Sequence, residues 1–195
     1  DPQNQNKLIK NIEDIKEKIA GFTLRETKDS SSIELPEKIF ENIFIEFSSE
    51  QGKIYTKALT ELRTKIEKEN ISFEDNVEAF LKRIIRIRQI CSNPKMLDLS
   101  FNEKTNRLQK TLELVRSIAE KNEKCIIWTS FKYNINYLKV FLEKFNPVAL
   151  DGSMQNDERK LSVTRFLEQE DTKVLIATPQ SSKEGLTLTV ANHCI

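Results

Sequence analysis

The chain has 195 residues, of which 38% are hydrophobic and 31% are charged. This composition supports one packed domain, alone or with a helical attachment, and argues against a disordered chain. The 31 basic and 30 acidic side chains leave a net charge near +1. Any contact with a nucleic acid or an acidic partner therefore depends on a local patch, because there is no overall basic field.

Three cysteines stand in apolar runs and form no C-x-x-C pair. Their odd number favours a reducing compartment, so we expect an intracellular protein, cytoplasmic if bacterial. No run of about 18 apolar residues occurs, and we expect no membrane partner. The chain opens at Asp1 without methionine and ends on an apolar, strand-like stretch. We therefore expect a piece of a longer protein.

The first third of the chain reads as a polar segment followed by helices. A short helix is predicted over 8–19, before a serine run at 30–32 that is typical of a linker. The stretch 39–47 carries apolar side chains at 43, 45 and 47, and this period of two predicts a half-buried strand. A helix is then predicted over 50–69, capped by Ser48 or Ser49, and another over 76–91, which Asn93-Pro94 ends.

From Thr105 onward, short apolar runs alternate with amphipathic segments. Strands are predicted at 125–128, 148–150, 173–177 and 193–195, with helices between them, the last of these capped by Asn156 or Asp157. This alternation is typical of a parallel sheet. We therefore predict an α/β fold, a parallel sheet flanked by helices with an N-terminal helical attachment. The expected parts are a linker segment (1–34), a strand plus a helical protrusion (35–104) and the sheet lobe (105–195).

Polar residues follow three of the predicted strands. Thr129 and Ser130 follow the first, Gly152 and Ser153 the second, and the loop from Thr178 to Gly185 the third. Ligands of parallel sheets bind at the carboxyl ends of strands, and hydroxyl and backbone N–H groups there suit phosphate oxygens. Ordinary loops of any doubly wound protein would give the same pattern, so both interpretations stay open.

The sequence lacks several motifs that catalysis would require. The four glycines are too far apart for a phosphate-binding loop. Asp151 looks like a Walker-B carboxylate, yet without that loop a turn aspartate is the simpler interpretation. His193 has no partner at ligand spacing, which favours a strand-end histidine over a metal ligand. No histidine is placed to activate a serine. We therefore expect no complete catalytic set and no metal site.

The predicted helix over 76–91 carries a basic face and one exceptional arginine. Lys82, Arg83 and Arg86 cluster opposite the apolar stripe, either as a solvated face or as a contact to duplex phosphates. Arg88 projects into the apolar stripe. An unpaired buried guanidinium is costly, so we expect Arg88 to pair with a carboxylate or with helix-end carbonyls as a structural clamp.

Seven motifs occur in a recognisable order along the chain. They are FTLRETK (22–28), ELPEK (34–38), IFIEFSSEQGKIY (43–55), IRQICSNP (87–94), KCIIWTSF (124–131), LDGS (150–153, with Glu158, Arg159 and Phe166) and the segment from 174 to 195. Together they resemble the Swi/Snf-type ATP-dependent DNA translocases of helicase superfamily 2, specifically the second RecA-like lobe. The resemblance covers nearly the whole chain.

This resemblance implies a function for the strand-end loops. The loop after 173–177 would be motif V, with Gly185, Leu186 and Thr187 at the ATP cleft between two lobes. Thr129, Ser130, Gly152, Ser153 and Thr178 would lie near DNA phosphates. ATP and Mg²⁺ would be bound mainly by the first lobe of the full-length protein, and double-stranded DNA and that lobe would be the partners. This piece alone would be inactive.

Several departures from the family pattern leave a second interpretation open. Pro179 replaces an arginine of motif V, the loop keeps a single glycine, and Ser92-Asn93-Pro94 replaces Asn-His-Pro. The chain also ends before motif VI, whose arginine completes the ATP site by stabilising charge on the transferring phosphoryl group. A non-catalytic helicase-like module for protein or DNA binding is therefore the alternative. An unrelated response-regulator-like domain fits the alternation, but it explains neither Arg88 nor the front half.

Overall fold

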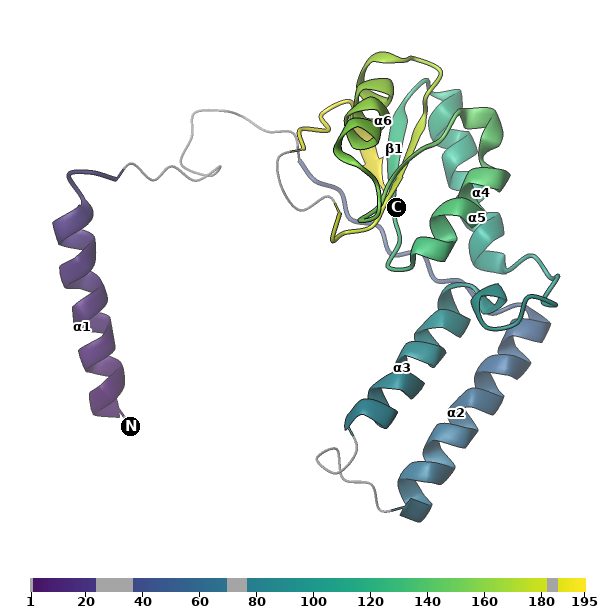
Figure 1. The fold of residues 1–195 in the computed structure, drawn as a ribbon, viewed down its shortest axis with the longest axis horizontal. Coiled ribbons are helices and arrows are strands. Elements are labelled where there is room, and N and C mark those ends of the chain that lie inside the picture. The colour runs from purple at the N-terminus through teal and green to yellow at the C-terminus, as the bar shows by residue number, and fades with distance from the viewer. Residues whose placement is uncertain (1, 24–36, 70–76, 182–185) are drawn as a thin grey trace. The chain divides into compact units, whose positions relative to one another are not determined.

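The computed structural model describes residues 2–23, 37–69, 77–181 and 186–195 (Figure 1). The chain divides into two compact units, Asp1–Ile43 and Phe44–Ile195. The predicted serine linker and Gly185 lie outside the described residues. No described helix is long and apolar enough to cross a membrane.

Among its described residues, the first unit contains the helix α1 (Pro2–Ile19), which confirms the predicted helix and begins earlier than the apolar pattern. Lys16 and Lys18 stand in its last turn, where cations favour the helix dipole. The Thr23 hydroxyl donates a hydrogen bond to the carbonyl of Ile19 over 2.8 Å, which satisfies one of the terminal acceptors of the helix.

The second unit begins with a helical hairpin. Helices α2 (Ser49–Glu69) and α3 (Val77–Ser92) lie side by side, and both confirm predicted helices (Figure 1). The start of α2 is capped from a distance: a Glu103 carboxylate oxygen accepts from the Ser48 hydroxyl over 2.6 Å and from the Glu50 amide over 3.2 Å. Ser48 thus takes part in the cap as a donor to a carboxylate.

The strand predicted within 39–47 is wrong, because these residues form no strand. An alternating pattern becomes a strand only where a neighbouring strand supplies hydrogen-bond partners. Here the carbonyl of Glu46 instead accepts from the side-chain amide of Asn106 over 3.1 Å. Phe44, within the same stretch, is 94% exposed.

After the hairpin, the described part of the second unit contains a four-stranded sheet in the order β2-β3-β1-β4. Its strands are β1 (Lys124–Trp128), β2 (Val148–Leu150), β3 (Val174–Ala177) and β4 (Ala191–Cys194). Each neighbouring pair is parallel. These strands confirm the predicted strands and the predicted parallel α/β fold.

Helices cover both faces of this sheet. They are α4 (Asn106–Glu120), α5 (Lys132–Phe141) and α6 (Asn156–Glu168), with short 3₁₀ turns at η1 (Pro94–Met96) and η2 (Glu143–Phe145). Successive side chains of β1 point to opposite faces: Cys125 and Ile127 pack with residues of α4 and α5, whereas Ile126 packs with Phe166 of α6. The strands β1, β2 and β3 are therefore packed between two helical layers, whereas β4 is partly exposed.

The cap of α6 differs from the prediction. The N-cap residue is Gln155, one residue before Asn156, and its backbone N–H donates to the Glu158 carboxylate over 3.4 Å. A glutamate three residues into the helix stabilises the first turn in this way. The sequence signal pointed to Asn156 or Asp157 because these are the commoner capping residue types.

Candidate functional site

The loops after β1, β2 and β3 begin at one edge of the sheet. Leu150 of β2 and Trp128 of β1 both stand opposite Ala177, the last residue of β3. Backbone hydrogen bonds continue past the strand ends, from Thr129 N to the Ala177 carbonyl (3.0 Å) and from Thr178 N to the Leu150 carbonyl (3.2 Å). The structure thus brings the three predicted strand-end segments together.

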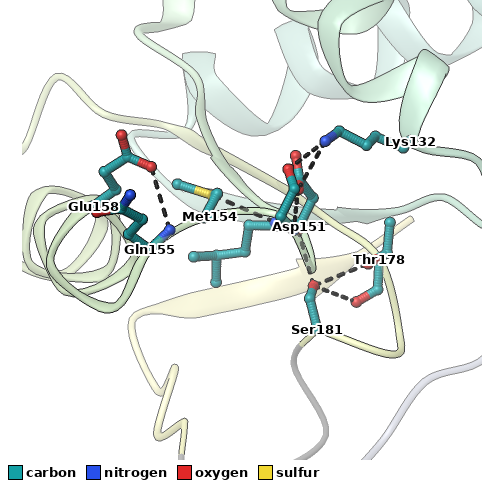
Figure 2. Close-up of polar contacts among 9 residues, drawn as sticks. Lys132, Asp151, Met154, Gln155, Glu158, Thr178 and Ser181 are labelled. Carbon is teal, nitrogen blue, oxygen red and sulfur yellow. Dashed lines mark hydrogen bonds and ion pairs between the residues drawn. The ribbon is translucent and has the colours of Figure 1, made fainter.

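The loop after β2 is organised around Asp151 (Figure 2). One of its carboxylate oxygens accepts from the Ser153 amide (2.7 Å) and the Ser153 hydroxyl (2.5 Å), and it lies 3.4 Å from Nζ of Lys132. Lys132 also contacts the Ser153 hydroxyl. Burial acts to raise the pKa of Asp151, but the hydrogen bonds from Ser153 and the charge and hydrogen bond of Lys132 outweigh it, so the pKa is lowered.

This arrangement favours the turn-aspartate interpretation of Asp151. Its side chain is only 13% exposed, and its carboxylate accepts hydrogen bonds from Ser153 in the turn that follows. Gly152 and Ser153 themselves are exposed. Lys132, at the start of α5, brings a half-exposed ammonium group to the same place. Sequence reasoning missed Lys132, although its position directly after the β1 loop was a usable signal.

The loop after β3 is fastened to β2 through Ser181 (Figure 2). The Ser181 hydroxyl lies 3.0 Å from the Leu150 carbonyl and 2.9 Å from the Thr178 carbonyl, and it accepts from the Thr178 hydroxyl over 2.9 Å. Leu186 packs against the core layer that contains Phe166, and Thr187 is exposed. Sequence reasoning missed Ser181, whose signal was a hydroxyl three residues after Thr178, the spacing of a turn.

The loop after β1 turns its two hydroxyl residues in opposite directions. Thr129 is 8% exposed, and its hydroxyl oxygen accepts from the Asn134 side chain (3.2 Å) and the Phe131 amide (3.4 Å). Ser130 is exposed. Of the two, only Ser130 therefore presents its side chain to solvent.

The basic face of α3 is solvated. Nζ of Lys82 lies 2.6 Å from a Glu78 carboxylate oxygen, and both side chains are more than two-thirds exposed, at 73% and 80%. An exposed pair of this kind contributes little stability. Arg86 is exposed and Arg83 is half-buried, so these groups remain accessible to an anionic partner.

Arg88 does not occupy the buried position expected for it. Its side chain is exposed, and its guanidinium carbon lies 6.0 Å from the centre of the Phe131 ring, a cation–π distance. In the part of the chain that the structure describes, no carboxylate forms a salt bridge with Arg88. The helical pattern gave the wrong surroundings for Arg88, because it cannot show that Phe131, distant in sequence, supplies an aromatic partner at the surface.

Metal binding gains no support from the described residues. Among them, no group of three His, Cys, Asp or Glu side chains could hold a metal ion. His193 lies in β4, with its Nε2 2.6 Å from a Glu123 carboxylate oxygen. It is thus a strand residue with a local polar partner.

The fold and the strand-end loops define a RecA-like lobe of the helicase type. Residues 103–195 match the helicase conserved C-terminal domain, and residues 2–96 match the SNF2-related domain. Together the two matches span almost the whole chain, which thus carries the SNF2-related and helicase C-terminal domains of the Swi/Snf family.

Two relatives match along the whole chain. A putative ATP-dependent helicase/translocase of Bacillus subtilis, YwqA, is 31% identical over 204 residues, which cover 100% of this chain and 22% of that protein. An uncharacterized ATP-dependent helicase of Mycoplasma genitalium, MG018, is 27% identical over 197 residues, which cover 100% of this chain and 19% of that protein. The chain thus spans about a fifth of the length of these relatives.

Solved structures share the fold. The C-terminal domain of a SWI2/SNF2 ATPase from Sulfolobus solfataricus has a TM-score of 0.70 at 18% identity, covering 79% of this chain and 69% of that one. The ATPase core from the same organism in complex with dsDNA has a TM-score of 0.71 at 22% identity, covering 93% of this chain and 40% of that one.

Proposed function

We propose that this chain is most of the second motor lobe of a DNA-stimulated ATPase, which moves along double-stranded DNA in the full-length protein. One observation carries the proposal: three adjacent strand-end loops lie at one edge of the sheet, and hydrogen bonds join them. Ser181 connects two of these loops, and Thr129 N connects the third to β3. A linked set of loops suits a motor, because a change at one can alter the others.

DNA contact in this proposal goes to phosphates. Ser130, Gly152 and Ser153 are exposed at the sheet edge with Lys132 beside them. Hydroxyl, amide and ammonium groups bind phosphate oxygens without reading base identity, as a motor on arbitrary sequence requires. The buried Thr129 would hold the loop in the conformation that exposes Ser130. The basic side chains of α3 would supply a second phosphate contact: Lys82, Arg83 and Arg86.

ATP contact in this proposal goes to the loop after β3. Gly185, Leu186 and Thr187 would line one side of the inter-lobe cleft, while the first lobe would bind most of the ATP and its Mg²⁺. Thr178 would connect this loop to the loop after β2, which would contact DNA phosphates. Its hydroxyl donates to Ser181, whose hydroxyl in turn lies within hydrogen-bond distance of the Leu150 carbonyl at the end of β2. The 195 residues alone would not hydrolyse ATP, because their sequence has no phosphate-binding loop. We also propose an intracellular location, from the unpaired cysteines.

The test compares ATP hydrolysis by the full-length parent, with and without duplex DNA, with hydrolysis by this 195-residue chain. We expect strong duplex stimulation in the parent and no hydrolysis by the chain. Thr178→Ala and Gly185→Asp in the parent should lower the DNA-stimulated rate with folding intact. Thr164→Ala, at an exposed position of α6, is the matched control and should leave the rate unchanged. Unchanged stimulated rates in Thr178→Ala and Gly185→Asp would count against the motif V assignment.

A non-catalytic helicase-like module is the second candidate. The observation that favours it is the loop sequence, in which Pro179 stands where the family has arginine and Gly185 is the single glycine. Absence of hydrolysis in both the parent and the chain, with duplex binding retained, would establish this candidate over the motor.

A further inference from the structure

Four polar side chains meet where α3 ends beside the loop after β1. We call Ser92, Asn93, Thr129 and Asn134 the amide cluster. Three of its members are almost fully buried, with exposed fractions of 4% for Asn93, 8% for Thr129 and 6% for Asn134. Buried amides are costly unless hydrogen-bonded, so their partners are informative.

Asn134 is the centre of the amide cluster. Its side-chain oxygen accepts from Nδ2 of Asn93 over 3.1 Å. Its own Nδ2 donates to the Ser92 hydroxyl over 2.8 Å and to the Thr129 hydroxyl over 3.2 Å. Both N–H groups and the carbonyl of the Asn134 amide are therefore used, and they connect two separate elements, the end of α3 and the loop after β1.

The orientation of both amides follows from a neighbouring backbone group. The Lys95 N–H can only donate, and it lies 3.1 Å from Oδ1 of Asn93. Nδ2 of Asn93 must then face Asn134, which requires the Asn134 oxygen on that side and its Nδ2 toward the two hydroxyls. The hydrogen-bond directions in the amide cluster are therefore mutually consistent.

The amide cluster decides which side chain the loop presents. Because Asn134 holds the Thr129 hydroxyl inward, the next residue, Ser130, faces solvent. Arg88 adds a second connection between α3 and the same loop through the Phe131 ring, 6.0 Å away. Two independent contacts thus fasten one loop to one helix.

We propose that Asn134 is a positioning residue for DNA binding. It fastens the loop 129–131 to the end of α3, so that Ser130 and the basic face of α3 meet the phosphates of one duplex at a fixed separation. This inference rests on the proposed function. Holding two contact sites in their bound arrangement saves the ordering cost of binding, so loss of Asn134 should weaken DNA binding although Asn134 touches no DNA.

The test uses the full-length parent, with duplex DNA titrated into the ATPase assay. Asn134→Ala should raise the DNA concentration for half-maximal stimulation at least about fivefold, while basal ATPase without DNA changes less than about twofold. The apparent DNA affinity should also depend less steeply on salt, because fewer phosphates are contacted together. The matched control is Asn136→Ala, the same residue type at an exposed position of α5, which should behave as wild type.

Ser92→Ala is a milder variant that tests the positioning role of Asn134 if Asn134→Ala does not fold. It removes one of the two hydrogen bonds that Nδ2 of Asn134 donates, and it should raise the half-saturating DNA concentration about two- to threefold. An unchanged value in Ser92→Ala, when Asn134→Ala does not fold, would overturn the inference.

The remaining outcomes separate this inference from the function on which it rests. If duplex DNA does not stimulate the wild-type parent, both fail together. If it does and Asn134→Ala matches Asn136→Ala, only the positioning role fails. A parallel loss of basal and stimulated rates with unchanged half-saturation would show a purely structural role, which also overturns the inference.

Discussion

Replacing Gln51 by leucine should destabilise the lobe measurably. Gln51 is 2% exposed in α2, and its Nε2 donates to the Ile90 carbonyl over 2.8 Å and to the Cys91 carbonyl over 3.4 Å. Both carbonyls lie at the end of α3. In a continuing helix they would accept from the backbone N–H groups four residues later, at positions 94 and 95, but neither group is available. Pro94 has no N–H for Ile90, and the Lys95 N–H donates to Asn93.

The expected size follows from these contacts. Gln51→Leu keeps nearly the same volume, so the main loss is hydrogen bonding to buried carbonyls. Leaving a buried acceptor unpaired costs about 1–3 kcal/mol. For a cooperative unit of about 150–250 residues, each kcal/mol lowers the melting temperature by about 2–4 °C, so a fall of about 2–12 °C is expected.

Scanning calorimetry of the full-length parent can measure this shift in the transition of the second lobe. Gln109→Leu is the matched control, because Gln109 also donates to a carbonyl, that of Lys104 over 3.3 Å, but at an exposed site of α4. A change within about 0.5 kcal/mol is expected there. Equal melting temperatures of the two variants would refute the assignment of Gln51 as the cap of α3.

Two further predictions concern Arg88 and Cys125. Arg88→Ala should lower the melting temperature of the parent by no more than about 4 °C, because an exposed cation–π contact contributes about 0.5–1 kcal/mol and each kcal/mol corresponds to about 2–4 °C; a fall well beyond this limit would show a buried arginine. Burial, with a smaller contribution from Cys194, raises the pKa of Cys125 from 9.0 to about 12, so at pH 8 a thiol reagent should modify it about 1000-fold more slowly than an ordinary thiol. The raised pKa also means that its contribution to stability is complete below pH 9 and is lost as pH rises toward 12. Mass spectrometry of the native parent should find Cys194 labelled long before Cys125, and equal rates would contradict the burial of β1.

Periodicity predicted the fold well where local sequence decides structure. The apolar run of β3 is buried at every position, and the stripe containing Val115 identifies the core side of α4. The same reasoning failed at 43–47, because alternation reports a half-buried surface and carries no information on whether a partner strand exists. It also missed the Glu103 cap of α2, since no local pattern reveals a partner more than fifty residues away.

The candidate site was predicted in outline. Strand ends located Ser130, Ser153 and Thr178 at one edge, because parallel strands bring their carboxyl ends together. The sequence could not show that Thr129 faces inward or that Asn134 holds it there. Such orientations depend on tertiary hydrogen bonds, and an isolated asparagine in a helix has many ordinary explanations.

The polar contacts at the base of the α2–α3 hairpin set a condition for exchanging it between relatives. Glu103 and Asn134 belong to the segment 103–195 that matches the helicase C-terminal domain, whereas their partners Ser48, Ser92 and Asn93 belong to the hairpin or its flanks. A hairpin grafted from a relative would need these pairs to match on both sides of the junction. Chimeras that carry matched pairs together should assemble, and those that mix them should leave buried polar groups unpaired at the seam.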